Sequence, residues 1–240
     1  MTIAKWEKNE SVAILSMDNG ANKHNLNFAK DMLKILDEIL TDQEIKALIL
    51  TSTDEKNWSQ GVDLEWLMDR FKEKDTEAMK AFMYRMNDLF KKLLLYPVPV
   101  IAAINGHAFG NGAILSCACD FRFMRSDKGF FCFPEVNIGI PFLPGMIAWT
   151  KKAMPYYKFQ ELKYTGKRAG AVELEKDHVI HKACANLEEL KEETLNFAKS
   201  FQKKRGIFGE MKKRMHKEII DIMDQEDPKY IEPLLLMVTD

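Results

Sequence analysis

The stretch VPVIAAINGHAFGNGAILSCACDFRFM, residues 98–124, is the part of the chain that says most about its fold. Residues 98–105 are mostly apolar, which predicts a buried strand. A glycine-rich loop follows over residues 106–112, and the apolar segment 113–118 predicts a short buried helix. Strands that alternate with helices in this way are typical of an α/β protein with a buried sheet.

The same alternation extends in both directions from this stretch. Upstream, we expect strands at 12–17 and 46–51, an amphipathic helix at 28–40, and a long helix at about 76–96 that Pro97 and Pro99 end. Downstream, we expect short strands at 121–124 and 130–133, then helices at about 144–165, 187–204, 208–226 and 229–238. The prediction is an α/β core over residues 1–185 and a helical region over residues 186–240 that packs on the core or on a neighbouring subunit.

Composition excludes several classes of protein. The 240 residues carry 35 Lys plus Arg and 36 Asp plus Glu, so no basic surface favours nucleic-acid binding. We find no run of about 18 apolar residues that would span a membrane, and no signal peptide is expected at the N-terminus. The cysteines lack CxxC or zinc spacing, which favours buried thiols in a reducing compartment, and so a cytoplasmic protein; they are Cys117, Cys119, Cys132 and Cys184.

Two glycine-containing loops are candidates for backbone recognition of a ligand. One is WSQGVDL, residues 58–64, and the other is residues 106–112; each lies between a predicted strand and a helix. Backbone N–H groups at a helix start are unpaired and lie at the positive end of the helix dipole. Two such loops side by side would aim two N–H groups at one oxygen, which is an oxyanion hole. Spacing alone fits two ordinary tight turns at least as well.

Glu135 is the candidate catalytic carboxylate, within FCFPEVNIGI, residues 131–140. Aromatic and aliphatic neighbours would desolvate a carboxylate there and raise its pKa towards that of a useful base. The alternative is a glutamate that points into solvent from the edge of a strand, which is the commoner position for this residue type.

Taken together, KALILTS…WSQGVDL, the stretch 98–124 and FPEVNIGIPFLPG resemble the crotonase superfamily, which contains enoyl-CoA hydratases and isomerases. The resemblance covers roughly residues 10–185. It implies a spiral of ββα units with a C-terminal helical region that builds a homotrimer or a dimer of trimers. It also implies an acyl-CoA thioester as substrate, with its carbonyl oxygen between two backbone N–H groups. Coenzyme A is then part of the substrate, and no metal or other cofactor is expected.

The resemblance also assigns roles to individual residues. Val62 and Asn111 would provide the two oxyanion N–H groups, with Asn111 at the middle of a triplet where the family mostly has glycine. Hydratases carry one glutamate three residues after that position, where this chain has Ile114, and a second at the position of Glu135. Because one carboxylate can move one proton from C2 to C4, the resemblance favours Δ3,Δ2-enoyl-CoA isomerisation over hydration.

Further residues are expected around the substrate. Lys23 and His24 would lie near the CoA phosphates, although a solvated turn fits equally well. Gln60, Gly61 and Gly110 adjoin the expected donors, and Trp66 could line the acyl pocket together with Leu67, Phe82 and Met86, unless these are plain core. The alternatives are an enoyl-CoA hydratase, a thioester hydrolase, a decarboxylase or a non-catalytic acyl-CoA binder.

Overall fold

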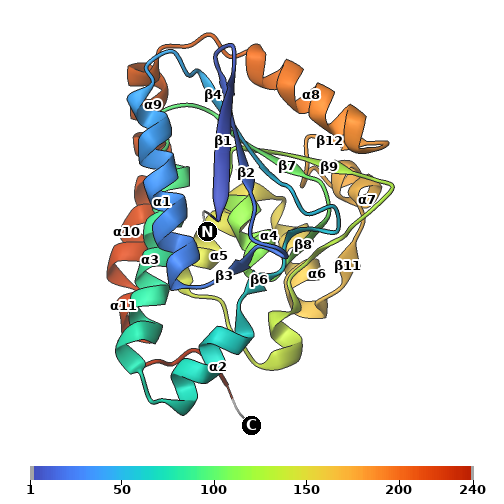
Figure 1. Cartoon of the computed structure of the whole chain (residues 1–240). Helices are drawn as coiled ribbons and strands as arrows, with labels where there is room; N and C mark the ends of the chain where they lie inside the picture. Colours follow the sequence, from blue (N-terminus) through green and yellow to red (C-terminus); the bar gives the residue numbers. More distant parts are fainter. Residues whose placement is uncertain (1–2, 239–240) are drawn as a thin grey trace.

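A large, mostly parallel sheet forms the centre of the computed structural model, which describes residues 3–238 (Figure 1). Its strand order is β1-β2-β4-β7-β9-β12, and within this sheet, among the described residues, only the β1–β2 pair is antiparallel. The strands are β1 (Ala4–Asn9), β2 (Val12–Met17), β4 (Ala47–Ser52), β7 (Val100–Ile104), β9 (Phe121–Arg125) and β12 (Lys182–Cys184). Four of them, β2, β4, β7 and β9, confirm strands predicted from the sequence.

Side chains alternate between two buried layers along the central strands. In β4, Leu48 and Leu50 enter the main core, whereas Ala47 and Ile49 face a second apolar cluster beneath α8 (Leu187–Lys199). A strand that is buried on both faces needs apolar residues at every position, because successive side chains point to opposite faces. This explains why the central strands are continuous apolar runs in the sequence.

A smaller sheet carries the strands that follow those of the large sheet. Its order is β11-β10-β8-β5, with β5 (Asn57–Ser59), β8 (His107–Phe109), β10 (Phe131–Cys132) and β11 (Arg168–Ala169). Thus β4 leads to β5, β7 to β8 and β9 to β10, and a helical segment follows each pair. These repeats confirm the expected α/β spiral of ββα units. A third, two-stranded sheet pairs β3 (Lys23–His24) with β6 (Gly61–Val62) in parallel.

Helices surround the sheets and close the site region. In Figure 1, α1 and α3 stand together on one side, α8 lies on the other side, and α2 lies close to the last described residues. The first group is α1 (Leu26–Thr41), α2 (Leu64–Lys72), α3 (Thr76–Leu94), α4 (Asn111–Ala118) and the 3₁₀ helix η1 (Pro134–Ile138). The second group is α5 (Pro144–Ala153), α6 (Tyr156–Thr165), α7 (Ala171–Lys176), α9 (Arg205–Met215), α10 (Lys217–Gln225) and α11 (Pro228–Ile231).

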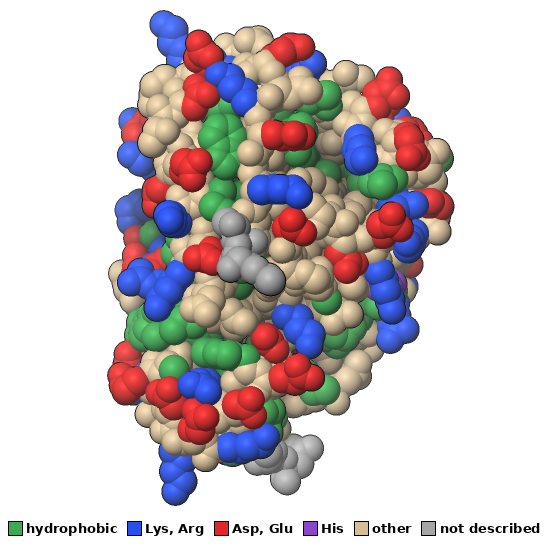
Figure 2. Space-filling view, in the orientation of Figure 1, with side chains coloured by type: hydrophobic (Ala, Val, Ile, Leu, Met, Phe, Trp, Pro, Cys, Tyr) green, Lys and Arg blue, Asp and Glu red, His purple; other side chains and the backbone are tan. Residues whose placement is uncertain are grey.

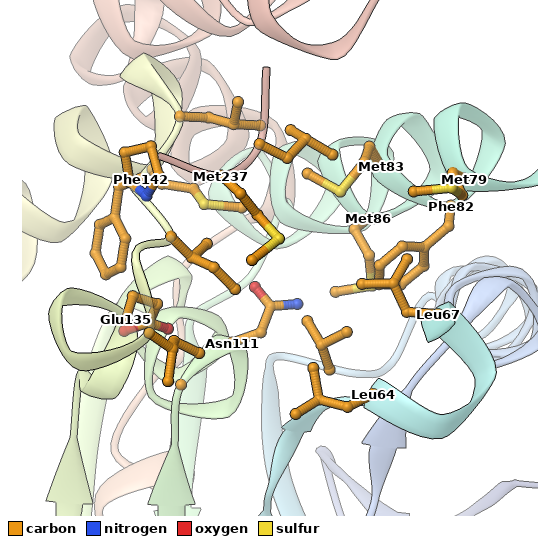
Figure 3. A pocket seen from close by; sticks show the side chains of 18 of the residues that line it. Leu64, Leu67, Met79, Phe82, Met83, Met86, Asn111, Glu135, Phe142 and Met237 are labelled. Atoms are coloured by element: carbon orange, nitrogen blue, oxygen red, sulfur yellow. The ribbon is translucent and has the colours of Figure 1, made fainter. Parts of the chain in front are cut away.

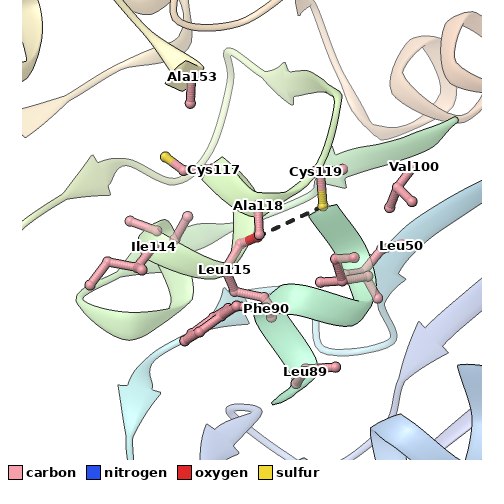
Figure 4. Packing of buried hydrophobic residues seen from close by; sticks show 14 of the residues in the cluster. Leu50, Leu89, Phe90, Val100, Ile114, Leu115, Cys117, Ala118, Cys119 and Ala153 are labelled. Atoms are coloured by element: carbon pink, nitrogen blue, oxygen red, sulfur yellow. Dashed lines mark hydrogen bonds between the residues drawn. The ribbon is translucent and has the colours of Figure 1, made fainter. Parts of the chain in front are cut away.

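The short helix α4 is buried on all sides, as its apolar sequence predicts. It packs between α3 and α5, and the Cys119 thiol donates to the Leu115 carbonyl oxygen at 3.8 Å (Figure 4). All four cysteines are buried as free thiols in the described chain, which confirms that part of the prediction. Burial on every face gives this helix no freedom to shift, so it is a rigid support for the loop that precedes it.

Several predicted boundaries are wrong for local reasons. The helix expected at 144–165 breaks into α5 and α6 at Pro155, whose ring excludes an N–H donor. The helix expected at 208–226 divides at His216, and the one at 229–238 ends at Ile231. Beyond it the chain extends, and the Val238 N–H donates to the Gly139 carbonyl at 2.8 Å. Strand β1 was not anticipated, because its sequence shows no apolar run. Helix α2 is the helix expected after the loop at residues 58–64, for which the sequence predicted no bounds.

Charged groups of both signs cover the surface. Figure 2 shows Lys and Arg intermixed with Asp and Glu across the face in view, as the near-equal totals of 35 and 36 imply. Within residues 3–238, none of the helices is both long and apolar enough to cross a membrane.

Candidate active site

A cavity of about 520 Å³ lies between helices α2 and α3, the start of α4, η1 and the last described residues of the chain (Figure 3). Its wall is almost entirely apolar. The apolar side chains of α2 and α3 that line it are Leu64, Leu67, Phe71, Met79, Phe82, Met83 and Met86. Opposite them lie Phe142, Leu143, Met146, Leu234, Leu236 and Met237. Such a cavity suits a flexible apolar chain, because methionine side chains adapt their shape to it.

The two glycine loops meet at one end of this cavity. Gly61 has φ +78°, and a Cβ atom there would lie 2.6 Å from the Phe109 carbonyl oxygen and 2.8 Å from the Asn111 nitrogen. The loop before Val62 is therefore in direct backbone contact with the first residue of α4. Asn111 is the first residue of that helix, so its N–H has no partner within the helix. The tertiary structure thus brings the two expected oxyanion donors together.

Glu135 lies directly beside these loops. It is in the single turn of η1, where Pro134 occupies the first position, and a Cβ atom on Gly110 would be 3.3 Å from its Oε1 atom. Its side chain is only 7% exposed, and its Oε2 atom has no hydrogen-bond partner among the described residues. Glu135 is therefore neither on a strand nor in solvent. Burial raises its pKa to about 7, which suits a base that works near neutral pH.

Lys163 is a charged neighbour that the sequence analysis missed. Lys163 lies four residues after the buried Phe159 on α6, so the two side chains share one face of the helix. This spacing was the signal in the sequence that Lys163 faces the protein interior. Its Nζ atom is 3.3 Å from the centre of the Phe142 ring, and it has no hydrogen-bond partner within residues 3–238. Burial lowers the pKa of Lys163 to about 8, whereas its positive charge lowers the pKa of Glu135.

We expect Lys163→Met to move the acidic limb of the pH–activity profile to higher pH by about one unit. The reason is that removal of a nearby positive charge disfavours the Glu135 carboxylate, which is the active form of a base. The rate on the alkaline plateau should change little. Lys167→Met is the control. It removes the same positive charge from a lysine that pairs with Glu161 and Glu173. Identical profiles for Lys163→Met and wild type would contradict the coupling.

Most of the other predicted residues line the cavity, but four do not: Lys23, His24, Gly61 and Trp66. Gln60, Gly110 and Ile114 line it, as do Leu67, Phe82 and Met86. Trp66 lies outside the cavity wall, with its ring edge-on to Phe82 at 5.4 Å. Lys23 is at the surface, 3.8 Å from Glu65, and is not part of the cavity wall.

The prediction that His24 contacts the substrate is wrong for this structure. The ring is fully buried, and both of its nitrogens contact protein side chains. Burial also lowers its pKa to about 3, so the neutral ring offers no charge to a phosphate. Neither the contact with CoA phosphates nor the alternative of a solvated turn is found, because a lone histidine next to a lysine carries no sign of burial in the sequence.

One acidic cluster lies away from the cavity. Glu161, Glu173 and Asp177 have oxygens within 4.8 Å of one another, as metal ligands do. Lys158, however, pairs with all three, at 2.6 Å from Glu161 and 2.8 Å from Asp177. Lys167 also pairs with Glu161 and Glu173, so each of the three carboxylates already has an ammonium partner, and we assign no metal to them.

Comparison with known folds places this architecture in the crotonase class. An enoyl-CoA hydratase from Bacillus halodurans superposes with a TM-score of 0.84 over 96% of this chain and 94% of its own, at 20% identity. A Mycobacterium tuberculosis protein, described as an enoyl-CoA isomerase in its apo structure and as a probable enoyl-CoA hydratase in another structure, gives in the apo form a TM-score of 0.85 over 97% and 98%, also at 20% identity. At this level of identity, the likeness establishes the fold.

The chain belongs to the enoyl-CoA hydratase/isomerase family, whose model matches residues 7–230. A short-chain-enoyl-CoA hydratase from Clostridium acetobutylicum is 35% identical over 136 residues, or 56% of this chain and 50% of that protein. The peroxisomal enoyl-CoA delta isomerase 2 from Arabidopsis thaliana is 30% identical over 139 residues, or 56% and 57%. The alignments thus span about half the length of these relatives, which include both activities.

Proposed function

We propose that the protein is an acyl-CoA isomerase that converts a 3-enoyl-CoA to the trans-2-enoyl-CoA. The observation that carries the proposal is the number of carboxylates among the described residues that line the cavity. Among the described residues that line it, Glu135 is the single carboxylate, and it faces the loops that hold Val62 and Asn111. Ile114, where hydratases of this family are expected to have their other glutamate, is apolar and 2% exposed.

Catalysis would begin with the thioester carbonyl. Its oxygen accepts hydrogen bonds from the backbone N–H groups of Val62 and Asn111, and the acyl chain occupies the apolar cavity. Glu135 removes a proton from C2, and the electrons move into a dienolate whose negative oxygen lies between the two donors. Each donor of this kind typically contributes ~2.7–4 kcal/mol of transition-state stabilisation. Protonated Glu135 then returns the same proton to C4, so the double bond moves and the base is regenerated.

The burial of Glu135 supports both halves of this cycle. A pKa of about 7 leaves a substantial carboxylate fraction at neutral pH for the first transfer. The same pKa also keeps protonated Glu135 available as the acid for the second transfer. Glu135 is then of similar strength as an acid and as a base near neutral pH. The apolar wall excludes water that would exchange or quench the transferred proton. Hydration, in contrast, needs a held water and a second acid–base group, and Ile114 supplies neither.

The test is to incubate purified protein separately with trans-3-hexenoyl-CoA and trans-2-hexenoyl-CoA and to follow the ultraviolet absorbance of the conjugated thioester. We expect absorbance to rise with the first substrate and to change slowly with the second. Rapid loss of absorbance with the second substrate would instead establish a hydratase. Release of free CoA thiol would indicate hydrolysis, and acyl-CoA binding without turnover would indicate a binding protein. The homotrimer or dimer of trimers, and the cytoplasmic location, stay predictions.

A further inference from the structure

A buried chain of polar side chains connects the two glycine loops. The His24 Nε2 atom is 2.9 Å from the Ser59 Oγ atom, and its Nδ1 atom is 3.0 Å from the Asn111 Nδ2 atom. His24 and Ser59 are fully buried, and Asn111 is 6% exposed. The imidazole also stacks on Phe28 with 4.3 Å between ring centres. The ring is therefore held on its face and at both nitrogens.

The donor and the acceptor of each hydrogen bond among Ser59, His24 and Asn111 can be assigned, starting from Ser59. The Ser59 hydroxyl has one hydrogen, which it donates to the Asn22 carbonyl at 2.8 Å. Ser59 Oγ must therefore accept from His24, so the Nε2 atom carries the ring hydrogen. Nδ1 is then an acceptor, and only the NH₂ end of Asn111 can face it. The burial that keeps His24 neutral is what this arrangement requires.

Each end of this chain of contacts lies next to one expected oxyanion donor. The Gly61 N–H donates to Ser59 Oγ at 3.1 Å, and Gly61 directly precedes Val62. At the other end, the Asn111 side chain belongs to the residue whose backbone N–H is the second donor. We propose that His24 is a positioning residue, which sets the separation of the Val62 and Asn111 N–H groups through Ser59 and the Asn111 side chain. This inference rests on the proposed function.

The Asn111 side chain has a definite role in this proposal. Glycine at that position would have no side chain to bind His24, and the two loops would then be connected by backbone contact alone. In this chain the amide provides an additional fixed contact at a residue that starts a buried helix. Donors held in place before the charge develops stabilise a transition state more than donors that must reorient. Loss of the contact should therefore lower kcat and leave KM nearly unchanged.

The experiment is a double-mutant cycle with His24→Phe and Asn111→Gly. Phenylalanine retains the stack on Phe28 and removes both hydrogen bonds, whereas glycine retains the backbone N–H. We expect His24→Phe alone to lower kcat about 10- to 100-fold, and to have a much smaller effect when Asn111 is already glycine. Ser116→Ala is the control, because it removes another buried hydroxyl contact, to the Ala113 carbonyl, from the same helix. Its kcat should equal that of wild type.

A spectroscopic measurement separates positioning from folding. The infrared carbonyl band of a bound, ¹³C-labelled saturated acyl-CoA should lie below its position in water for wild type, because the two N–H groups polarise the carbonyl. His24→Phe should reduce this shift. If His24→Phe does not fold, Ser59→Ala removes the same connection with a smaller change in volume and should reduce the shift as well.

Three outcomes would overturn the inference. The first is an infrared carbonyl shift in folded His24→Phe that equals that of wild type. The second is a loss of kcat in the double variant that equals the product of the two single losses. The third is a lower melting temperature of His24→Phe with an unaltered kcat. A failure of the proposed function is distinguishable, because the wild-type protein would then hydrate trans-2-hexenoyl-CoA or release free CoA thiol. The shift of the bound thioester band, and its reduction in His24→Phe, would remain in that case.

Discussion

Glu135→Gln is expected to lower the isomerisation rate by about 10²- to 10⁴-fold, the usual contribution of a positioned general base. Glutamine has nearly the same shape but cannot accept and return a proton. KM should change little, because the carbonyl contacts are made by backbone N–H groups elsewhere. The measurement is kcat and KM with a 3-enoyl-CoA. The control is Glu192→Gln, because Glu192 lies on the exposed face of α8. Activity within about tenfold of wild type would mean that another group takes the proton.

The same variant should be more stable than wild type at alkaline pH. The folded-state pKa of Glu135 is about 7, above the ordinary value of 4.5. The folded protein therefore holds this proton more tightly than the unfolded chain does, and its stability falls as pH rises from about 4.5 to 7. Glutamine has no such titration. We expect the free energy of unfolding of Glu135→Gln to exceed that of wild type by about 2–3 kcal/mol at pH 8, with little difference at pH 4.5.

This stability prediction has a direct check. Urea unfolding at several pH values should show the two proteins diverging only across the interval in which Glu135 ionises. Equal stability at pH 8 would mean that the carboxylate is better solvated in the folded protein than its 7% exposure indicates. A loss of stability for Glu135→Gln at every pH would mean that the carboxyl group makes a structural hydrogen bond.

Gly61→Ala is expected to have the second-largest effect, a loss of about 10²- to 10³-fold in kcat. The added Cβ would lie 2.6 Å from the Phe109 carbonyl oxygen and 2.8 Å from the Asn111 nitrogen. Because both contacts are with backbone, the two loops must separate, and the donors of Val62 and Asn111 separate with them. The positive φ of +78° adds strain of about 1–3 kcal/mol.

A matched control for this variant is Gly170→Ala. No atom lies within 4 Å of the position of a Cβ on Gly170, and its φ of −87° is ordinary for alanine. Its activity should match wild type, and its stability should stay equal or rise slightly. Both proteins should be examined by circular dichroism before their rates are compared. If folded Gly61→Ala retains wild-type kcat, the contact between the loops has no role in catalysis.

The order of the elements around the site was predictable because it depends on local sequence. Continuous apolar runs predicted β4 and β7, since strands that are buried on both faces require apolar residues at every position. An alternating pattern that ends in a turn predicted β2. Boundaries were harder to predict. The edge strand β1 packs only part of one face, and its pattern AKWEKN is too polar to be recognised. Helix α2 has an apolar stripe at helical spacing, Leu64, Leu67 and Phe71, but the stripe lines the cavity and none of its residues is buried in the core.

The sequence by itself determined the class of fold, the glycine positions and the presence of one carboxylate among apolar neighbours, because each depends on residues close together in the chain. Only the tertiary structure decided which groups meet. It placed Gly110 next to Glu135, buried His24 between Ser59 and Asn111, and brought Lys163 and Met237 to the same cavity region. Contacts between distant segments, and the desolvation that raises the pKa of Glu135, depend on how the whole chain packs and not on any local pattern.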